Sequence, residues 1–341
     1  MMNIAQIGVG YWGPNLLRNL VSNKRCSVST VVDISADRRA YVQGLYPSIN
    51  VGDNVEQALG DPNVDAVVIA TPVATHYDLA IKALSMGKHI FVEKPLARSA
   101  VEVDQIGALA EKKNRVAMVG HTFLFNSAVR YVKKLIDSGE LGDIRYIYSQ
   151  RLNLGRIRSD VDALWNFAPH DVSIIQYWLG DPKPLSVVRR GVDYIQDNID
   201  DVVFMNIMYP KKVMANIHVS WLDPLKVRTM VVVGSKKMVV YDDTADNKIA
   251  VYDKGIDRMA ILGQNMDYDN QHFPTFNHRS GDVLLPKIDF KEPLKVELDH
   301  FIDCIEKGVE CIAGIDHAKK VVAIMETLGK PAAESLQINM A

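Results

Sequence analysis

The chain has 341 residues, 48% of them hydrophobic and 23% charged, which is enough for two domains with separate buried cores. Its formal net charge is −2, and its basic residues are spread along the sequence instead of forming a stripe, which argues against a nucleic-acid partner. The three cysteines form no CxxC pair, so the sequence favours reduced thiols over a disulfide framework or a zinc cluster.

The first residues, MMNIAQIGVGYWG, begin directly with a strand-like run and lack the basic and apolar segments of a signal peptide. The longest apolar runs, such as Val67–Ala70 and Met230–Val233, are far shorter than the roughly 20 residues that a membrane span requires. We therefore expect a cytoplasmic protein without a membrane partner.

Short apolar runs alternate with helical patterns from Asn3 to about Val119, which is typical of βαβ units and a parallel sheet. Strands are predicted at Asn3–Gly8, Cys26–Asp33, Ala66–Thr71, His89–Glu93 and Val116–Gly120. Helices are predicted at Gly13–Asn23, Arg38–Leu45, Val55–Leu59, His76–Met86 and Ala100–Lys113. Residues 1–123 are thus expected to form an NAD-binding Rossmann domain with a doubly wound parallel sheet.

The pattern changes after about Phe123, where strand-like runs follow one another with few helices between them. Helices are predicted at Ala128–Ser138 and Asp171–Leu179, and strands at Ile144–Asn153, Ser186–Tyr194, Asp201–Tyr209, Val213–Trp221, Lys226–Gly234 and Lys237–Asp242. Residues 124–341 are therefore expected to form an α+β domain with a large, mostly antiparallel, open-faced sheet, giving an α/β protein overall.

Towards the end of the sequence, Asp257–Lys291 has few periodic apolar residues, and we expect an irregular excursion or lid there. It contains His272 and His278 near Asp267 and Asp269, but no known metal-ligand spacing joins them, so no metal site is predicted. Two helices, Leu294–Lys307 and Ile315–Leu328, are expected to follow.

The segment Gly8-Val9-Gly10-Tyr11-Trp12-Gly13 stands between the first predicted strand and helix, where a GxGxxG motif binds a dinucleotide. Gly8 allows the tight turn, Gly10 lets the backbone approach a pyrophosphate, and Gly13 allows close packing of helix on strand. The helix N-terminus then offers free N–H groups to the phosphates. The alternative is a tight strand–helix turn without a ligand.

Asp33 ends the second predicted strand, where an acidic side chain hydrogen-bonds the adenosine ribose and repels a 2′-phosphate. NAD is therefore favoured over NADP, although Arg38 and Arg39 lie within one turn. The alternative role for Asp33 is to cap a turn.

Glu93-Lys94-Pro95 follows a predicted strand at the sheet edge where ligands bind in open α/β sheets. Burial and a nearby positive nicotinamide would bring the pKa of a lysine there towards the roughly 7–8 that suits proton transfer. Taken by itself, a Glu-Lys pair of this kind is more often a surface ion pair.

These motifs, together with Ala70-Thr71-Pro72 and His76, resemble the Gfo/Idh/MocA family of sugar and inositol dehydrogenases. The resemblance covers the chain nearly end to end, because the family's C-terminal pattern is matched by Val296-Glu297-Leu298, Phe301, Ile305 and Gly308. It implies a cofactor shell formed by Gly8, Gly10, Tyr11, Trp12, Gly13, Asp33, Thr71, Pro72, His76, Glu93 and Lys94. His76 also has the simpler interpretation of beginning the helix that follows it.

The resemblance further implies an acid/base pair formed by Lys94 and a histidine that the family carries near the start of a helix. The match is His170, in Asn166-Phe167-Ala168-Pro169-His170, and its alternative role is to cap the helix Asp171–Leu179. Asn166 stands where the family usually has aspartate, and asparagine cannot accept a proton. Asp162 or Asp171 could take over that role.

Arg151, Arg156 and Arg158 precede the presumed catalytic helix, and the surrounding sequence is similar to the family branch that acts on nucleotide-linked sugars in surface polysaccharide pathways. Guanidinium groups there could bind a substrate diphosphate in a bidentate manner, or could belong to a solvated loop. This branch implies 3-dehydrogenation of a UDP-N-acetylhexosamine or its uronate, with Lys94, Asn166 and His170 also contacting the substrate.

Three alternatives remain open at this point: an inositol or free-sugar dehydrogenase, a deoxysugar ketoreductase, and a non-catalytic NAD-binding regulator. Since the open sheet face of the second domain commonly packs on another subunit in the family, the resemblance also implies a homodimer or homotetramer.

Overall fold

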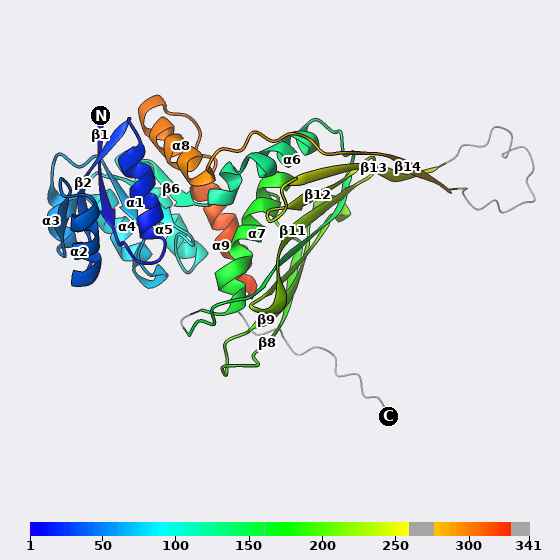
Figure 1. The fold of residues 1–341 in the computed structure, drawn as a ribbon, viewed down its shortest axis with the longest axis horizontal. Helices are drawn as coiled ribbons and strands as arrows, with labels where there is room; N and C mark the ends of the chain where they lie inside the picture. The colour runs from blue at the N-terminus through cyan, green and yellow to red at the C-terminus, as the bar shows by residue number, and fades with distance from the viewer. Residues whose placement is uncertain (160, 259–275, 329–341) are drawn as a thin grey trace, which may run out of the picture. The chain divides into compact units, whose positions relative to one another are not determined.

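The computed structural model describes residues 1–159, 161–258 and 276–328, and the chain divides into two compact units (Figure 1). Unit 1 comprises residues 1–127, 169–181 and the described residues from Phe290 onward, whereas unit 2 comprises residues 128–168 and 182–289. The units are thus not the two contiguous stretches, 1–123 and 124–341, that the sequence led us to expect.

Unit 1 is built on a six-stranded parallel sheet in the order β3-β2-β1-β4-β5-β6. Its strands are β1 (Met2–Ile7), β2 (Cys26–Val32), β3 (Asn50–Gly52), β4 (Ala66–Ile69), β5 (His89–Glu93) and β6 (Ala117–Gly120). Five of them were predicted, and the three-residue β3 was too short to produce a recognisable period. The doubly wound order confirms the predicted Rossmann fold.

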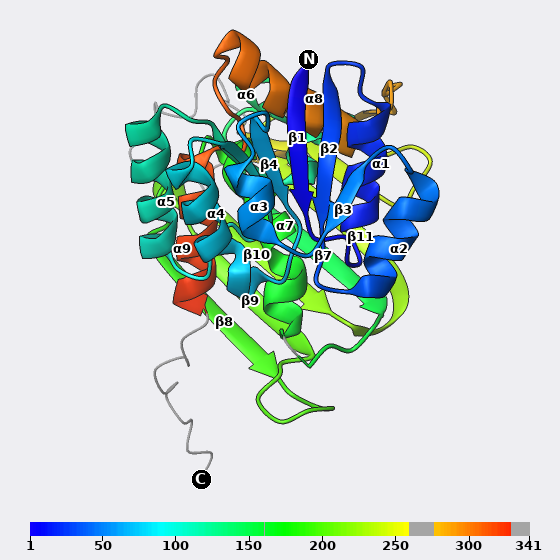
Figure 2. The same cartoon turned by 90° about the vertical axis from the view of Figure 1, so that its left-hand side faces the viewer.

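Helices cover both faces of this sheet, as the blue and cyan elements of Figure 2 show. They are α1 (Gly13–Ser22), α2 (Ala36–Leu45), α3 (Val55–Gly60), α4 (His76–Ser85), α5 (Ala100–Lys113), α8 (Pro293–Lys307) and α9 (Ile315–Leu328), with short 3-10 turns at Val73–Thr75 (η1) and Thr122–Phe125 (η2). Alternate strand residues serve opposite faces, so that Val67 packs with α3, α4 and α5 while Val68 packs with α1 and α8.

The two last helices belong to unit 1 because their apolar faces complete the core of the Rossmann domain. Leu298 and Phe301 of α8 join the cluster that contains Phe91, and Phe301 meets the Phe91 ring edge-on at 5.8 Å. On the opposite face of the sheet, Ala318 and Val322 of α9 pack against α5. These long-range contacts explain why a single boundary in the sequence does not separate the units.

Residues 169–181, the second half of α7 (Ala163–Leu179) and the turn after it, are tied to α9 by polar groups. His317 contacts Ser173 Oγ through Nε2 at 2.9 Å and Asp181 Oδ1 through Nδ1 at 2.9 Å. Although these three residue types also form catalytic triads, Ser173 is only 2% exposed, so this arrangement joins two helices instead of presenting a nucleophile.

Unit 2 is built on an eight-stranded sheet in the order β14-β13-β12-β11-β7-β10-β9-β8. The strands are β7 (Ile144–Leu154), β8 (Ser186–Val192), β9 (Val202–Met208), β10 (Met214–Ser220), β11 (Leu222–Gly234), β12 (Met238–Asp242), β13 (Ile249–Arg258) and β14 (Phe276–Leu284). Of the neighbouring pairs, β7 with β10 is parallel and the others are antiparallel, which confirms the predicted sheet. Helix α6 (Ser127–Asp137) precedes β7, and a 3-10 turn at Pro210–Lys212 (η3) separates β9 from β10.

Two sequence predictions in this region were wrong. Helix α7 begins at Ala163, not at Asp171, and continues through Pro169, since the buried apolar residues around the proline offset the one hydrogen bond that it removes. The segment expected to be irregular contains β14 and the end of β13. His278 lies exposed on β14, whereas Asp267, Asp269 and His272 lie outside the described residues.

One face of the unit 2 sheet exposes aromatic side chains while alternate residues are buried. Met205 on β9 is fully buried, but its neighbour Phe204 is 49% exposed and stacks on His218 at 4.0 Å. Tyr146 and Tyr148 on β7 are exposed in the same alternating manner. Among the described residues, no helix is long and apolar enough to cross a membrane.

Candidate cofactor and active site

The loop between β1 and α1 is held in a shape that only glycine allows at two positions. Gly8 has φ +93°, and a Cβ there would lie 2.6 Å from the Ala70 carbonyl oxygen. A Cβ on Gly13 would lie 2.5 Å from the Gly8 carbonyl oxygen. The buried side-chain amide of Gln6, on β1, holds this loop in place by donating to the carbonyl oxygens of Gly8 at 3.0 Å and Gly13 at 2.9 Å.

Gly10 differs from the other two glycines, because a Cβ there would meet nothing within 4 Å. The start of α1 has no side-chain cap and no acidic residue in its first turn, so no side chain of that turn neutralises the positive end of the helix dipole. Tyr11 is 90% exposed and Trp12 is 40% exposed on the same loop. This open, uncapped loop fits the pyrophosphate of a dinucleotide.

The Asp33 carboxylate lies beside the glycine loop. It accepts the Val9 N–H at 2.8 Å through one oxygen and the Ser35 N–H at 2.8 Å through the other. Arg39 donates to the carbonyls of Asp33 and Ile34, at 2.8 and 3.0 Å, which draws its guanidinium towards the backbone. Asp33 therefore combines the capping role with the position expected of a ribose-binding carboxylate.

Lys94 follows β5 at the carboxyl edge of the sheet, and the bond to Pro95 is cis. His76, the first residue of α4, braces this turn, since its Nδ1 lies 2.8 Å from the Pro95 carbonyl oxygen and its Nε2 lies 2.8 Å from that of Thr71. Burial lowers the pKa of His76, and the two backbone contacts oppose that effect. At 1% exposure, His76 has almost no surface for a cofactor, so it positions the loops after β4 and β5.

Thr71 and Pro72 form the loop after β4 that the sequence assigns to the cofactor. The Thr71 hydroxyl lies 2.7 Å from the Thr75 hydroxyl, which donates in turn to the Pro72 carbonyl at 2.9 Å. The Thr71 methyl would lie 2.9 Å from a Cβ on Gly8. This loop and the glycine loop are thus directly adjacent.

Two glutamates are buried behind Lys94. Burial raises the pKa of Glu93 to about 7, while the Lys94 charge, the Lys94 backbone N–H and the Trp12 indole lower it. Burial also raises the pKa of Glu297, on α8, well above its ordinary value, and the charge on Glu93 raises it further. The Thr122 hydroxyl donates to Glu297 Oε2 at 2.7 Å. Burial and the Glu93 charge therefore both favour the protonated form of Glu297.

His170 lies within α7, in the part that belongs to unit 1, so it does not cap a helix as its alternative role required. Its ring meets the Phe123 ring edge-on at 5.0 Å. Phe123 comes three residues after Gly120, which pairs with Glu93 across the β5–β6 ladder. The Phe123 contact therefore places His170 beside the segment that follows β6, the strand paired with β5.

Asn166 and the three arginines belong to unit 2, whereas Lys94 and His170 belong to unit 1. Asn166 lies in the first half of α7, whose N-terminus is capped by Asp162 through a 2.8 Å bond from the Trp165 N–H. Arg151 is 5% exposed within β7, whereas Arg156 and Arg158 are exposed beyond the end of that strand. Asp171 is buried in the unit 1 part of α7.

Sequence reasoning missed Gln6, Glu297 and His121 as members of this region. His121 directly follows β6, is 3% exposed, and has its pKa lowered by burial and by the charges of His317 and Lys94. A polar residue inside an apolar strand, such as Gln6, could have been noticed in the sequence. Glu297 matched the family's C-terminal pattern, but its place in this region depends on where α8 packs, which the sequence pattern does not give.

Two family models match the chain. Residues 2–121 match a model described as "Oxidoreductase family, NAD-binding Rossmann fold", and residues 129–240 match one described as "GFO/IDH/MocA C-terminal domain". The matches correspond to the parallel-sheet region and to much of the second sheet, and together they cover well over half of the sequence.

Named relatives agree with these matches. A 4-carboxy-2-hydroxymuconate-6-semialdehyde dehydrogenase from Sphingobium sp. is 32% identical over 56% of this chain and 63% of its own length. A UDP-N-acetylglucosamine 3-dehydrogenase from Acidithiobacillus ferrooxidans is 29% identical over 58% of this chain and 61% of its own. A crystal structure of GnnA, the latter enzyme, shares the fold with a TM-score of 0.78, at 22% identity over 96% of both chains. The aligned region spans about three fifths of the two relatives.

Proposed function

Because the chain belongs to the Gfo/Idh/MocA oxidoreductase family and carries its NAD-binding domain, we propose that it is an NAD-dependent dehydrogenase acting on a sugar CH–OH group. Support for this proposal comes from the position of Lys94 directly after β5, and from the contact of His170 with Phe123, which follows the neighbouring strand β6. When bound, NAD supplies the acceptor for the hydride that leaves the substrate carbon.

In this proposal, His170 takes the proton from the substrate hydroxyl as the C–H bond breaks. Lys94 donates a hydrogen bond to the same oxygen and stabilises its developing charge. The His76 brace and the buried Glu93 fix the direction of the turn that carries Lys94. Asn166 orients the substrate without accepting a proton, since an amide has no basic site.

We further propose that the substrate is a nucleotide-linked sugar, oxidised at C3 of a UDP-N-acetylhexosamine or its uronate in polysaccharide biosynthesis. Support comes from the 29% identical relative named as a UDP-N-acetylglucosamine 3-dehydrogenase. The exposed Arg156 and Arg158 guanidinium groups suit a diphosphate, and the buried Arg151 suits a supporting role within β7.

The exposed aromatic face of the unit 2 sheet supports the proposal that the protein is a homodimer or homotetramer. Phe204, Tyr146 and Tyr148 expose apolar area of a kind that commonly packs against another subunit. Sedimentation equilibrium of the full chain would test this, and a monomer at micromolar concentration would refute it. The cytoplasmic location remains our expectation from the sequence.

The function is tested by following NADH formation with purified protein, NAD and a panel of UDP-N-acetylglucosamine, its uronate, myo-inositol and free hexoses. Each substrate is assayed with and without 2-oxoglutarate, which would regenerate a tightly held cofactor. Turnover with UDP-sugars alone supports the full proposal. Turnover with inositol or a hexose refutes the nucleotide-sugar assignment and keeps the dehydrogenase. No turnover with any substrate favours a ketoreductase or an NAD-binding regulator.

A further inference from the structure

A cluster of one histidine and two cysteines lies at the end of α8 and contains neither member of the proposed acid/base pair. Within the described part of the chain, His300, Cys304 and Cys311 form the one group of such side chains whose potential ligand atoms all lie within 4.8 Å of one another. All three cysteines of the chain are free thiols. The sequence alone argued against a zinc cluster because it contains no CxxC pair.

The local structure explains how the three side chains meet. His300 and Cys304 are four residues apart on α8, so they lie on one side of the helix. The helix ends at Gly308, whose left-handed conformation (φ +64°) turns the chain back and returns Cys311 to that side. The loop is anchored beyond Cys311, because the Ala313 carbonyl accepts the Val119 N–H of β6 at 2.9 Å.

The spacing of the ligand atoms suits a small tetrahedral ion. Zinc binds cysteine sulfur at about 2.3 Å and histidine nitrogen at about 2.0–2.1 Å, which places tetrahedral ligand atoms roughly 3.5–3.8 Å apart. Cys304 Sγ and His300 Nε2 are 3.5 Å apart. His300 Nε2 also accepts the Ile312 N–H at 3.1 Å, so this nitrogen carries the lone pair that binding requires.

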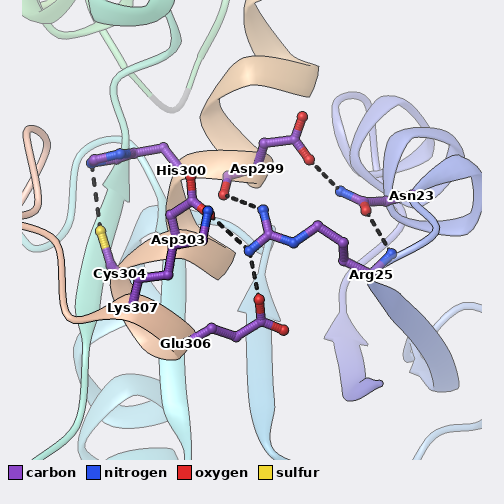
Figure 3. Close-up of polar contacts among 8 residues, drawn as sticks. All are labelled: Asn23, Arg25, Asp299, His300, Asp303, Cys304, Glu306 and Lys307. Carbon is purple, nitrogen blue, oxygen red and sulfur yellow. Dashed lines mark hydrogen bonds and ion pairs between the residues drawn. The ribbon is translucent and has the colours of Figure 1, made fainter.

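The surroundings admit a cation. His300 and Cys311 are partly exposed while Cys304 is buried, which leaves room for water as a fourth ligand. Figure 3 shows that the nearby Arg25 faces Asp303 and Glu306, with ion-pair distances of 2.7 and 2.6 Å, on the side of α8 away from His300 and Cys304. Its positive charge is therefore compensated by acidic partners.

We propose that His300, Cys304 and Cys311 bind one thiophilic divalent cation, zinc, with water in the fourth position. Such an ion would clamp the end of α8 to the loop that leads into α9. It would take over the His300 lone pair from the Ile312 N–H and displace one proton from each thiol. With three protein ligands and one water the coordination would be open, and none of the ligands belongs to the proposed acid/base pair.

The test uses the full chain, reduced and freed of metal and reductant. Zinc affinity is measured by competition with a chromophoric chelator in the wild type and in Cys304→Ser and Cys311→Ser, with Cys26→Ser as the matched control. We expect one equivalent in the wild type and the control, and at least roughly tenfold weaker binding in the other two. Equal affinity in all four proteins, or no saturable binding in the wild type, would overturn the proposal.

A second measurement does not depend on variants that fold poorly. Cobalt added to the wild-type protein should give the visible bands of a tetrahedral ion and an ultraviolet charge-transfer band of two thiolates. Zinc should also raise the unfolding temperature, because it binds only the folded chain. A cobalt spectrum without a thiolate charge-transfer band would overturn the proposal. It would also be overturned if, after reduction, Cys304 and Cys311 formed a disulfide again and the protein then bound no metal.

Discussion

The carboxyl groups of Glu93 and Glu297 lie within electrostatic range of each other, although 203 residues separate them in the sequence. Glu297 is fully buried, and burial together with the Glu93 charge raises its pKa well above the ordinary value. Glu93 has its own pKa raised to about 7 by burial. Burial and mutual repulsion therefore favour the protonated form of both carboxyl groups, relative to an exposed glutamate.

This pair makes the stability of the protein depend on pH. The folded chain keeps the Glu297 proton at a pH where the unfolded chain has lost it, so stability falls as pH rises from the unfolded pKa of about 4.3 towards the raised folded value. Glu297→Gln mimics the protonated acid and removes this loss. We expect the unfolding temperature to fall by several °C less between about pH 5 and pH 9 in the variant than in the wild type.

Thermal unfolding followed by circular dichroism at both pH values checks this expectation. Glu111→Gln, at an exposed glutamate of α5, is the matched control and should follow the wild type. If Glu297→Gln also followed the wild type, Glu297 would be ionised in the folded protein.

Removing either member of the proposed acid/base pair should strongly lower turnover while the protein still binds NAD. We expect Lys94→Ala and His170→Ala to lower kcat by roughly 100-fold to 10,000-fold, because each loses a group that acts on the substrate oxygen. The matched surface controls are Lys82→Ala and His278→Ala. Initial rates and NAD titration by fluorescence check this, and near wild-type turnover in either variant would exclude that residue.

Much of the Rossmann domain followed from the sequence, since local period and glycine placement determine these elements. The bounds of α5, α9 and β5 were predicted without error, and the glycine loop and Lys94 lie where their motifs indicated. The start of α7 was predicted wrongly because Pro169 is a strong local signal that tertiary burial overrides.

The rest of the site depends on contacts between distant segments. Glu297 reaches Thr122, and His317 reaches Ser173, only because α8 and α9 return to the first sheet. A pattern confined to one segment contains no information on such pairs. The composition of unit 1 from three stretches could not be predicted for the same reason.

The His76 brace should matter for the position of Lys94 and not for the chemistry itself. We expect His76→Ala to lose about 1–3 kcal/mol of unfolding free energy, because the backbone carbonyl that accepts the imidazole N–H, that of Pro95 or Thr71, loses its donor. The loosened turn should lower kcat more than it raises KM. Urea unfolding and steady-state kinetics test this against His278→Ala, and unchanged stability would show that the brace is dispensable.

Substitutions at two glycines of the glycine loop, Gly10 and Gly13, should distinguish a loss of NAD affinity from a loss of stability. In Gly10→Ala the new methyl group meets nothing in the free protein, so the unfolding temperature should stay within about 2 °C of the wild-type value. NAD affinity should nevertheless fall at least roughly tenfold, because the pyrophosphate must approach this backbone. In Gly13→Ala the methyl group would lie 2.5 Å from the Gly8 carbonyl oxygen, so both stability and affinity should fall.

Gly44→Ala, on α2 with open space around it, is the control and should stabilise the helix slightly. Calorimetric titration with NAD and thermal unfolding measure the two quantities, and equal affinity in Gly10→Ala and the wild type would mean that the dinucleotide does not cross this loop.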